Sequence, residues 1–158
     1  MATQQFSRSL PMMLYRALDA VMPRFRRIFN EFGLTEQQWR VLRVLWEHDD
    51  IAFRELAGLT LIPAPSLVGV VDRLTTNGLV ARRRSDDDRR NVFVHATAQG
   101  RELESEVRPR VDAAYAELRR SIDAAEWEQL IAGLERIAAV GAPSAAGKAT
   151  SENKAVNQ

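Results

Sequence analysis

A cluster of arginines near the middle of the chain has the residue type and the spacing to hold phosphate groups. Five of them fall within nine residues, at Arg82, Arg83, Arg84, Arg89 and Arg90. Their planar guanidinium groups are weakly hydrated and bind phosphates bidentately, which suits nucleic-acid backbones and narrow minor grooves. Acidic residues interrupt the cluster at Asp86, Asp87 and Asp88, so we expect at least one of them to pair with a neighbouring arginine. Taken alone, the cluster is equally typical of a solvated hairpin.

A second group of residues suits a carboxylate carried by an aromatic ring. Arg16 lies near an apolar helix face, where a guanidinium group needs an anionic partner. Ser9 comes two helical turns earlier on nearly the same face, and Trp39, with Arg43 nearby, offers a flat wall for a ring. These groups suit a hydroxylated aromatic carboxylate, because arginine binds a carboxylate bidentately. The alternatives are a surface salt bridge for Arg16 and a plain core position for Trp39; Trp46 is expected in the core.

Several other chemistries are excluded. The chain has no cysteine, which rules out a disulfide scaffold, a zinc finger and a thiol nucleophile. Its two histidines, His48 and His95, are too few and too far apart for a convincing metal site. No Ser/His/Asp arrangement or phosphate loop supports an enzyme. We therefore expect a protein that is not an enzyme and that holds no cofactor or metal.

Length and charge limit the remaining classes. A chain of 158 residues, 46% of them hydrophobic, favours one domain or one domain with a helical extension. Its 22 basic and 21 acidic residues give a net charge of +1, so a nucleic-acid surface must be a local patch. No apolar run approaches the roughly 20 residues of a membrane span, and the N-terminus lacks signal-peptide features. We expect a cytoplasmic protein.

Apolar periodicity predicts helices in the first half of the chain. The first runs from Ser9, which can cap it, to Phe32, with a kink expected at Pro23. Residues 35–38 fit a capping box that opens a second helix, which ends at Asp49. A short helix is predicted over 53–60, a turn over 61–63, and another helix over 64–77.

The pattern then changes to short β-prone runs at 79–84 and 91–96, joined by a polar connection. Thr97 caps a long helix with a bend expected at Pro109. A last helix, opened by Asp123 and Glu126, is expected to bury Trp127, Leu130, Ile131, Leu134 and Ile137. From Gly141 onward the composition is typical of disorder.

Helices followed by a two-stranded hairpin are the order of a winged helix-turn-helix, so the predicted fold is mainly α with a small β-hairpin wing. The helix at 64–77 begins with small and polar residues and would present its N-terminus to a phosphate or a base edge. In that setting, DNA contact by the arginine cluster is favoured over a merely solvated hairpin. Ser66 has two open roles, a DNA contact or a hydrogen bond to its own backbone.

The motifs that follow carry a family resemblance. They are Glu55-Leu56-Ala57, Pro65-Ser66-Leu67, Gly78-Leu79-Val80, Arg83-Arg84, Asp87-Asp88-Arg89-Arg90 and Thr97-Ala98-Gln99-Gly100. Over roughly residues 8 to 140 the chain resembles the multiple antibiotic resistance regulator (MarR) family. Ser9-Leu10-Pro11, Arg16 and residues 34–42 look more narrowly like the regulators of homoprotocatechuate and related aromatic-acid degradation.

The resemblance implies a homodimer whose first and last helices intertwine, with two winged lobes that read a pseudo-palindromic double-stranded DNA operator. It divides the chain into a dimerisation helix (8–33), a DNA-binding domain (34–97), C-terminal dimerisation helices (98–140) and a disordered tail (141–158). The DNA-binding candidates are Pro65, Ser66, Val68, Gly69, Arg73, Arg84, Asp88, Arg89 and Arg90. The ligand-binding candidates are Ser9, Arg16, Trp39 and Arg43.

Two positions depart from the family pattern. Many members carry an arginine where this chain has Gly69, and a threonine or serine where it has Val68. Gly69 lacks a base-reading side chain and weakens an exposed helix by about 1 kcal/mol relative to alanine. It can instead allow a close approach of the backbone.

The predicted function is sequence-specific DNA binding that controls transcription, as repression relieved by a small hydroxylated aromatic acid. One alternative keeps the DNA binding without a ligand, under control by abundance or by competition with other DNA-binding proteins. A helical partner protein with no DNA role is a further alternative, which the arginine-rich wing disfavours.

Overall fold

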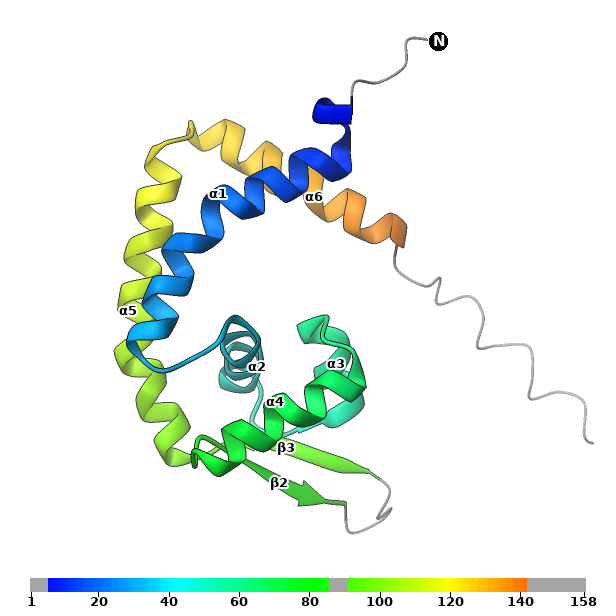
Figure 1. The fold of residues 1–158 in the computed structure, drawn as a ribbon, viewed down its shortest axis with the longest axis vertical. Coiled ribbons are helices and arrows are strands. Elements are labelled where there is room, and N and C mark those ends of the chain that lie inside the picture. Colours follow the sequence, from blue (N-terminus) through cyan, green and yellow to red (C-terminus); the bar gives the residue numbers. More distant parts are fainter. Residues whose placement is uncertain (1–5, 86–90, 142–158) are drawn as a thin grey trace, which may run out of the picture. The chain divides into compact units, whose positions relative to one another are not determined.

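The computed structural model describes residues 6–85 and 91–141. The chain divides into two compact units, one up to Tyr115 and one from Ala116 onward. Its described part is mainly helical with one small sheet (Figure 1), as the sequence predicts. The predicted hairpin connection at 86–90 and the predicted tail beyond residue 141 lie outside the described residues.

Helix α1 (Leu10–Glu31) follows a short 3₁₀ turn (Phe6–Arg8) and continues through Pro23. Ser9 stands at the N-cap position as predicted, but its side chain does not cap the helix. The hydroxyl instead donates a hydrogen bond of 2.8 Å to the carbonyl of Phe6, three residues earlier. The C-terminal half of α1 supplies Phe25, Ile28 and Phe29 to the core.

Helix α2 (Glu36–Glu47) opens with the predicted capping box. The Gln38 amide donates to the Thr35 hydroxyl at 3.2 Å, and the Thr35 amide donates back to the Gln38 side chain at 2.8 Å. Each bond satisfies a backbone donor that the first helical turn leaves without an intrahelical partner. The helix then buries Val41, Leu42 and Leu45 completely.

A tight turn joins α3 (Phe53–Thr60) to α4 (Ala64–Thr76). Leu61 adopts the left-handed conformation there, with φ of 53°, although its side chain is branched and 82% exposed. Arg40 on α2 donates a hydrogen bond of 3.1 Å to the Thr60 carbonyl. The end of α3 is therefore held from a neighbouring helix.

The sheet has three antiparallel strands in the order β1 (Ile51–Ala52), β3 (Val92–Ala96), β2 (Val80–Arg84). In the β2–β3 pair Val80 lies opposite Ala96, and Arg84 lies opposite Val92. The two longer strands confirm the predicted hairpin. Strand β1 was not predicted, because two residues are too short a run to display strand alternation.

Helix α5 (Ala98–Arg120) starts from Thr97, as predicted. The Thr97 hydroxyl accepts a 3.1 Å hydrogen bond from the Gly100 amide and donates a 2.6 Å one to the Gly78 carbonyl. These bonds fix the start of α5 against the turn between α4 and β2. The helix continues through Pro109.

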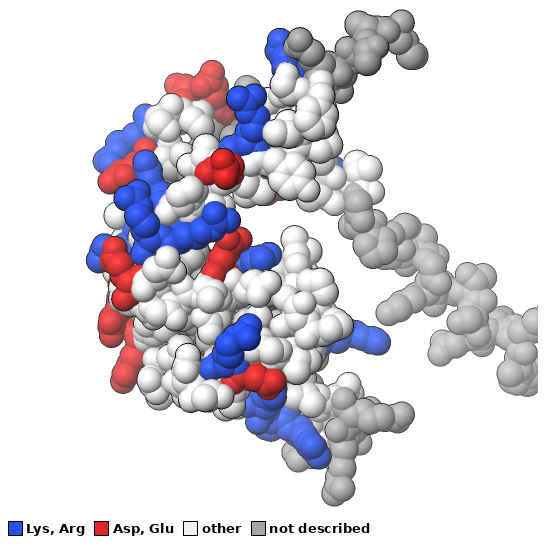
Figure 2. Space-filling model, viewed as in Figure 1, with Lys and Arg blue, Asp and Glu red and all other residues white. Residues whose placement is uncertain are grey.

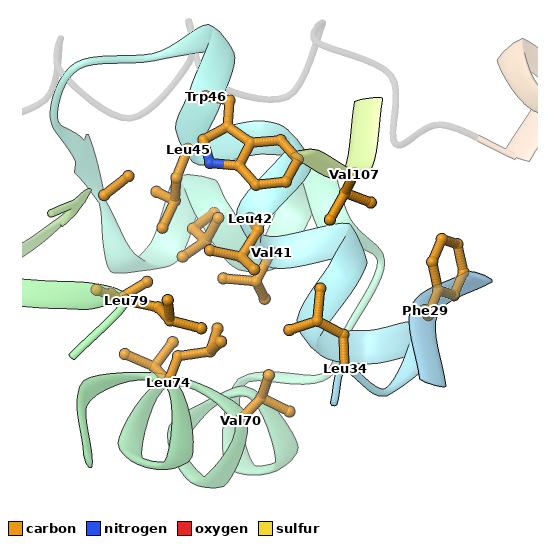
Figure 3. Packing of buried hydrophobic residues seen from close by; sticks show 14 of the residues in the cluster. Phe29, Leu34, Val41, Leu42, Leu45, Trp46, Val70, Leu74, Leu79 and Val107 are labelled. Atoms are coloured by element: carbon orange, nitrogen blue, oxygen red, sulfur yellow. The ribbon is translucent and has the colours of Figure 1, made fainter. Parts of the chain in front are cut away.

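The core of the first unit gathers around α2 (Figure 3). Leu42, Leu45 and Trp46 meet side chains from α4, from the start of the hairpin and from α5, among them Leu74, Leu79 and Val107. Trp46 is buried, which confirms its predicted place in the core. Because α4 packs directly on this core, its outer face is held in a fixed orientation.

The second unit contains the end of α5 and α6 (Ala124–Gly141). Arg119 pairs with Glu128 at 3.1 Å, and its guanidinium group lies 5.9 Å from the Trp127 ring centroid. A single chain leaves much of the apolar stripe of α6 uncovered, so its expected burial stays a prediction for an interface with a second copy. Trp127 and Leu134 are half-buried, and Leu130, Ile131 and Ile137 are exposed. Gly141, which we assigned to the tail, is the last residue of α6.

Among the described residues no single helix has the length and hydropathy of a membrane span. Only α3 and α4 together reach that length and hydropathy, as a pair bent by 104°.

Candidate nucleic-acid interface and ligand pocket

Helix α4 presents the predicted DNA-facing residues on one side. Leu67, Val70, Val71 and Leu74 point into the core. Pro65, Ser66, Val68 and Arg73 are exposed, and Gly69 is half-buried between them. The helical period of 3.6 residues separates the two sets. The buried set thus fixes which side chains the helix can offer to a partner.

Two arginines of β2 are held by carboxylates of the same lobe. Arg82 pairs with Asp72 of α4 at 2.6 Å and donates to the Val68 carbonyl at 3.4 Å. Arg83 pairs with Asp50, and its guanidinium group lies 4.9 Å from the Phe93 ring centroid. Arg82 therefore ties the wing to α4, and Arg83 ties it to the residues before β1.

Three other arginines have no ion pair or side-chain hydrogen bond with any described residue. They are Arg54 at the start of α3, Arg73 on α4 and Arg84 at the end of β2, and all three are exposed. Figure 2 shows basic side chains over α4 and β2 at the lower end of the view. Arg54 was not among the predicted DNA-binding residues. No sequence signal distinguishes it from an ordinary surface arginine.

An open groove of about 820 Å³ lies between α3, the start of α4 and the strands β2 and β3. Its apolar lining is Ala52, Phe53, Ala57, Ala64, Val68 and Val92. The polar lining includes Arg54, Arg82 and Arg84. The groove joins the exposed side of α4 to the wing, so both belong to one surface with a basic edge.

The wing residues Asp88, Arg89 and Arg90 lie outside the described residues. Their DNA contacts, and the pairing expected for Asp86, Asp87 and Asp88, stay predictions.

A second pocket, of about 280 Å³, opens between α2 and α5. It is lined by Trp39, Arg43, Trp46, Arg108, Val111, Asp112 and Tyr115. Trp39 stacks on Phe29 with centroids 4.8 Å apart and meets Trp46 edge-on at 5.4 Å. These contacts fix the indole ring of Trp39 as one wall.

Charged groups line the same pocket. Arg43 pairs with Glu47 through Nη2 at 2.9 Å, whereas its Nη1 is buried with no hydrogen-bond partner among the described residues. Arg108 pairs with Glu104 of its own helix. A buried donor without a partner costs free energy comparable to a lost hydrogen bond. Arg43 lines the pocket, so an acceptor that reached its Nη1 would relieve that cost.

The structure brings together two of the four predicted ligand-binding residues. Trp39 and Arg43 line the pocket, while Ser9 and the exposed Arg16 do not line it within one chain. Sequence reasoning missed Arg108, Asp112 and Tyr115. Tyr115 lies on α5, far from Trp39 in the sequence, and no sequence pattern indicates that both residues line one pocket.

A helix-turn-helix on a three-stranded sheet, with exposed arginines that have no ion pair among the described residues, defines a winged helix-turn-helix DNA-binding protein. The MarR family model matches residues 34–92. The homoprotocatechuate degradative operon repressor of Escherichia coli is 35% identical over 84% of this chain and 90% of its own length. The chain belongs to the MarR family and is a DNA-binding transcriptional regulator.

Two solved structures are similar over nearly the whole described chain. The structure of NadR in complex with 4-hydroxyphenylacetate is 36% identical, with a TM-score of 0.75, over 87% of this chain and 98% of that one. The structure of Bordetella bronchiseptica BpsR, whose DNA binding is regulated by 6-hydroxynicotinic acid, is 25% identical, with a TM-score of 0.80, over the same shares of both chains. The relatives and the family are regulatory, not enzymatic.

Proposed function

We propose that this regulator is a homodimeric, cytoplasmic repressor that a small hydroxylated aromatic carboxylate releases from DNA. The observation that carries the proposal is Arg43, which lines one pocket with Trp39 and whose Nη1 is buried without a hydrogen-bond partner among the described residues. NadR with 4-hydroxyphenylacetate and BpsR with 6-hydroxynicotinic acid support the same ligand class.

The pocket has a group for each part of such a ligand. The ring lies along Trp39, the carboxylate accepts from Arg43, and a ring hydroxyl meets Asp112 or Tyr115 at the α5 side. A volume of about 280 Å³ suits a single-ring acid, because pockets for larger, drug-sized ligands start at roughly 300 Å³. Ser9 and Arg16 lie outside this pocket, so their proposed contacts would have to come from a second chain.

A dimer is supported by apolar surface that one chain leaves uncovered. On α6, Leu130, Ile131 and Ile137 are exposed, and on α1 so are Leu10 and Leu18. Apolar stripes of this length on terminal helices favour an interface with a second copy. We assign dimerisation to residues 8–33 and 98–140, and DNA binding to 34–97.

DNA recognition is proposed for the surface formed by the exposed side of α4, the groove and the wing. Pro65, Ser66, Val68 and Gly69 would enter the major groove, and Arg84 would hold the backbone together with Arg54. Asp88, Arg89 and Arg90 complete the proposed contacts at the wing. Arg82 and Arg83 orient the wing instead, since each is paired with a carboxylate.

The test combines a DNA-binding assay with calorimetry. Full-length protein is bound to duplex DNA from upstream of its own gene and then titrated with hydroxylated phenylacetic, cinnamic, benzoic and nicotinic acids. We expect one class to release the DNA and to give heat on binding. Arg43→Met should bind the duplex as the wild type does and ignore the acids, whereas Arg27→Met, a matched change at an arginine that does not line the pocket, should respond normally. No heat and no release with any acid would contradict the ligand.

A regulator without a small-molecule ligand is the second candidate. It is favoured by the ion pairs of Arg43 with Glu47 and of Arg108 with Glu104, which balance both pocket guanidinium charges without an added anion. Such a protein would bind the upstream duplex tightly in the same assay and give no heat with the acids.

A further inference from the structure

The exposed side of α4 carries a glycine whose missing side chain leaves room for an arginine. A Cβ atom built at Gly69 would lie 3.9 Å from Nη1 of Arg73 and within 4 Å of no other atom outside its own helical backbone. The guanidinium group of Arg73 therefore lies over the place where a side chain at position 69 would project.

Helix geometry explains this placement. Residues four apart lie on the same face, and helical side chains lean toward the N-terminus of the helix. The side chain of Arg73 therefore places its charge about one turn, or about 5.4 Å, closer to the N-terminus of α4. The N-terminal residues of a recognition helix are the ones that contact base edges. Gly69 lets an arginine rooted near the C-terminal end of α4 reach toward that part of the helix.

The guanidinium group of Arg73 is also available for a new partner. It makes no ion pair or side-chain hydrogen bond with the described residues. The neighbouring carboxylate of Asp72 is held at 2.6 Å by Arg82. The pair with Arg82 thus engages the carboxylate that is adjacent to Arg73 in the chain.

We propose that Arg73 is a specificity-determining residue that reads a guanine in each half-site, donating to O6 and N7 in the major groove. Arginine is the side chain that most often makes this bidentate contact. Gly69 acts through Arg73, because a side chain larger than alanine there would occupy the space that the guanidinium group needs. The inference deepens the proposed DNA recognition by α4 and rests on it.

The experiment selects binding sites from a pool of duplexes with a randomised centre, using full-length wild type and variants. We expect the wild type to select sites with a fixed guanine in each half. Arg73→Ala should lose preference at that one position, by roughly 10- to 100-fold in relative affinity, and keep the other positions. Gly69→Leu should lose preference at the same position, although the residue changed is different.

Two matched variants complete the design. Gly69→Ala adds only the Cβ that lies at ordinary contact distance from Arg73, so it should keep the guanine. Arg54→Ala removes a guanidinium group elsewhere on the surface that has no ion pair with a described residue, so it should weaken binding to all sequences alike. Thermal melting checks that each variant is folded, and if Gly69→Leu fails to fold, Gly69→Thr takes its place.

Three outcomes overturn the inference. Arg73→Ala could select the same sites as the wild type, or it could lose affinity uniformly with a salt dependence reduced by about one unit, which marks a phosphate contact. Loss of binding by Gly69→Ala would show instead that the backbone at Gly69 touches the DNA. A wild type that selects no sequence at all would contradict the proposed DNA recognition by this surface, which is a separate result.

Discussion

The indole Nε1–H of Trp46 donates a 2.9 Å hydrogen bond to the backbone carbonyl of Gly100. The two residues are far apart in sequence, and the bond joins α2 to the first turn of α5. A Cβ atom at Gly100 would lie 2.1 Å from the carbonyl oxygen of Leu79. The missing side chain of Gly100 therefore permits the close contact between the first turn of α5 and the start of the wing. The hydrogen bond from Trp46 satisfies the Gly100 carbonyl and joins α2 to the same contact.

The first prediction concerns this contact. Gly100→Ala should lower the free energy of unfolding by about 3 kcal/mol, because backbone on both sides must shift to admit the methyl group. Gly58→Ala should instead raise the free energy of unfolding by about 0.5–1 kcal/mol, because a Cβ atom built at this helical position meets nothing within 4 Å. Urea unfolding at one fixed protein concentration measures both. Equal stability of the two variants would contradict the close contact.

The second prediction separates arginines that have an ion pair from those that have none within the described ranges. Arg54→Ala and Arg84→Ala should each weaken binding to duplex DNA and lower the salt slope by roughly one unit, as expected for a lost phosphate contact. Arg83→Ala should change the slope less, since Arg83 is held by Asp50 and Phe93. Binding titrations between low and moderate salt give all three slopes. Identical salt slopes for all three variants would contradict the distinction between arginines with and without an ion pair.

The third prediction concerns the wing residues that lie outside the described ranges. Arg90→Ala should weaken DNA binding by about 1–3 kcal/mol if the side chain enters the minor groove, and by less if it touches only a phosphate. Arg89→Ala is the companion variant, measured on the same duplex. The wing assignment fails if both variants bind like the wild type.

The fourth prediction concerns Asp72, which carries a negative charge on the DNA-facing helix. Asp72→Asn should raise affinity for arbitrary duplex DNA by about 0.2–1 kcal/mol, because it removes a charge that repels phosphates and releases Arg82 from a half-exposed pair. Asp19→Asn, on the exposed side of α1, removes the same charge away from this surface and should have no effect. Fluorescence anisotropy with an unrelated duplex compares them. A loss of affinity in Asp72→Asn would show that the pair with Arg82 mainly positions the wing.

The fifth prediction tests the dimer. Leu130→Asp or Leu134→Asp should abolish dimerisation or folding, because an interface that buries either position would bury an unpaired charge. Arg136→Asp places the same charge at an exposed polar position of α6 and should leave the assembly intact. Sedimentation equilibrium reports the mass of each species. A wild type that remains a folded monomer at all concentrations would exclude the dimer.

Local sequence signals predicted much of the fold. The capping box at Thr35 and the helix from Phe53 to Thr60 follow from residues adjacent in the chain, and both are confirmed with their bounds. The apolar stripe of α6 was recognised correctly as apolar, but its burial depends on which surface covers it. Periodicity identifies the face of a helix and not the partner of that face.

The candidate sites were harder to predict, because their properties depend on residues distant in sequence. Arg82 and Arg84 look alike in the sequence, yet Asp72 neutralises the first, and the second has no partner among the described residues. Arg54 is distant from both in the sequence and is grouped with them only because all three line the groove. Tyr115 meets the pocket of Trp39 from a helix that begins far along the chain. Pairing and proximity of this kind arise from tertiary packing.

The ion pairs of Arg82 and Arg83 also bear on how the protein finds its sites in a cell. Chromosomal DNA offers a vast excess of competing sequences, which hold a regulator mainly through unpaired positive charges. Two internal carboxylates mask part of the charge of this lobe. A smaller fraction of the protein is then bound to non-specific chromosomal DNA, so a lower protein concentration can keep its specific sites occupied.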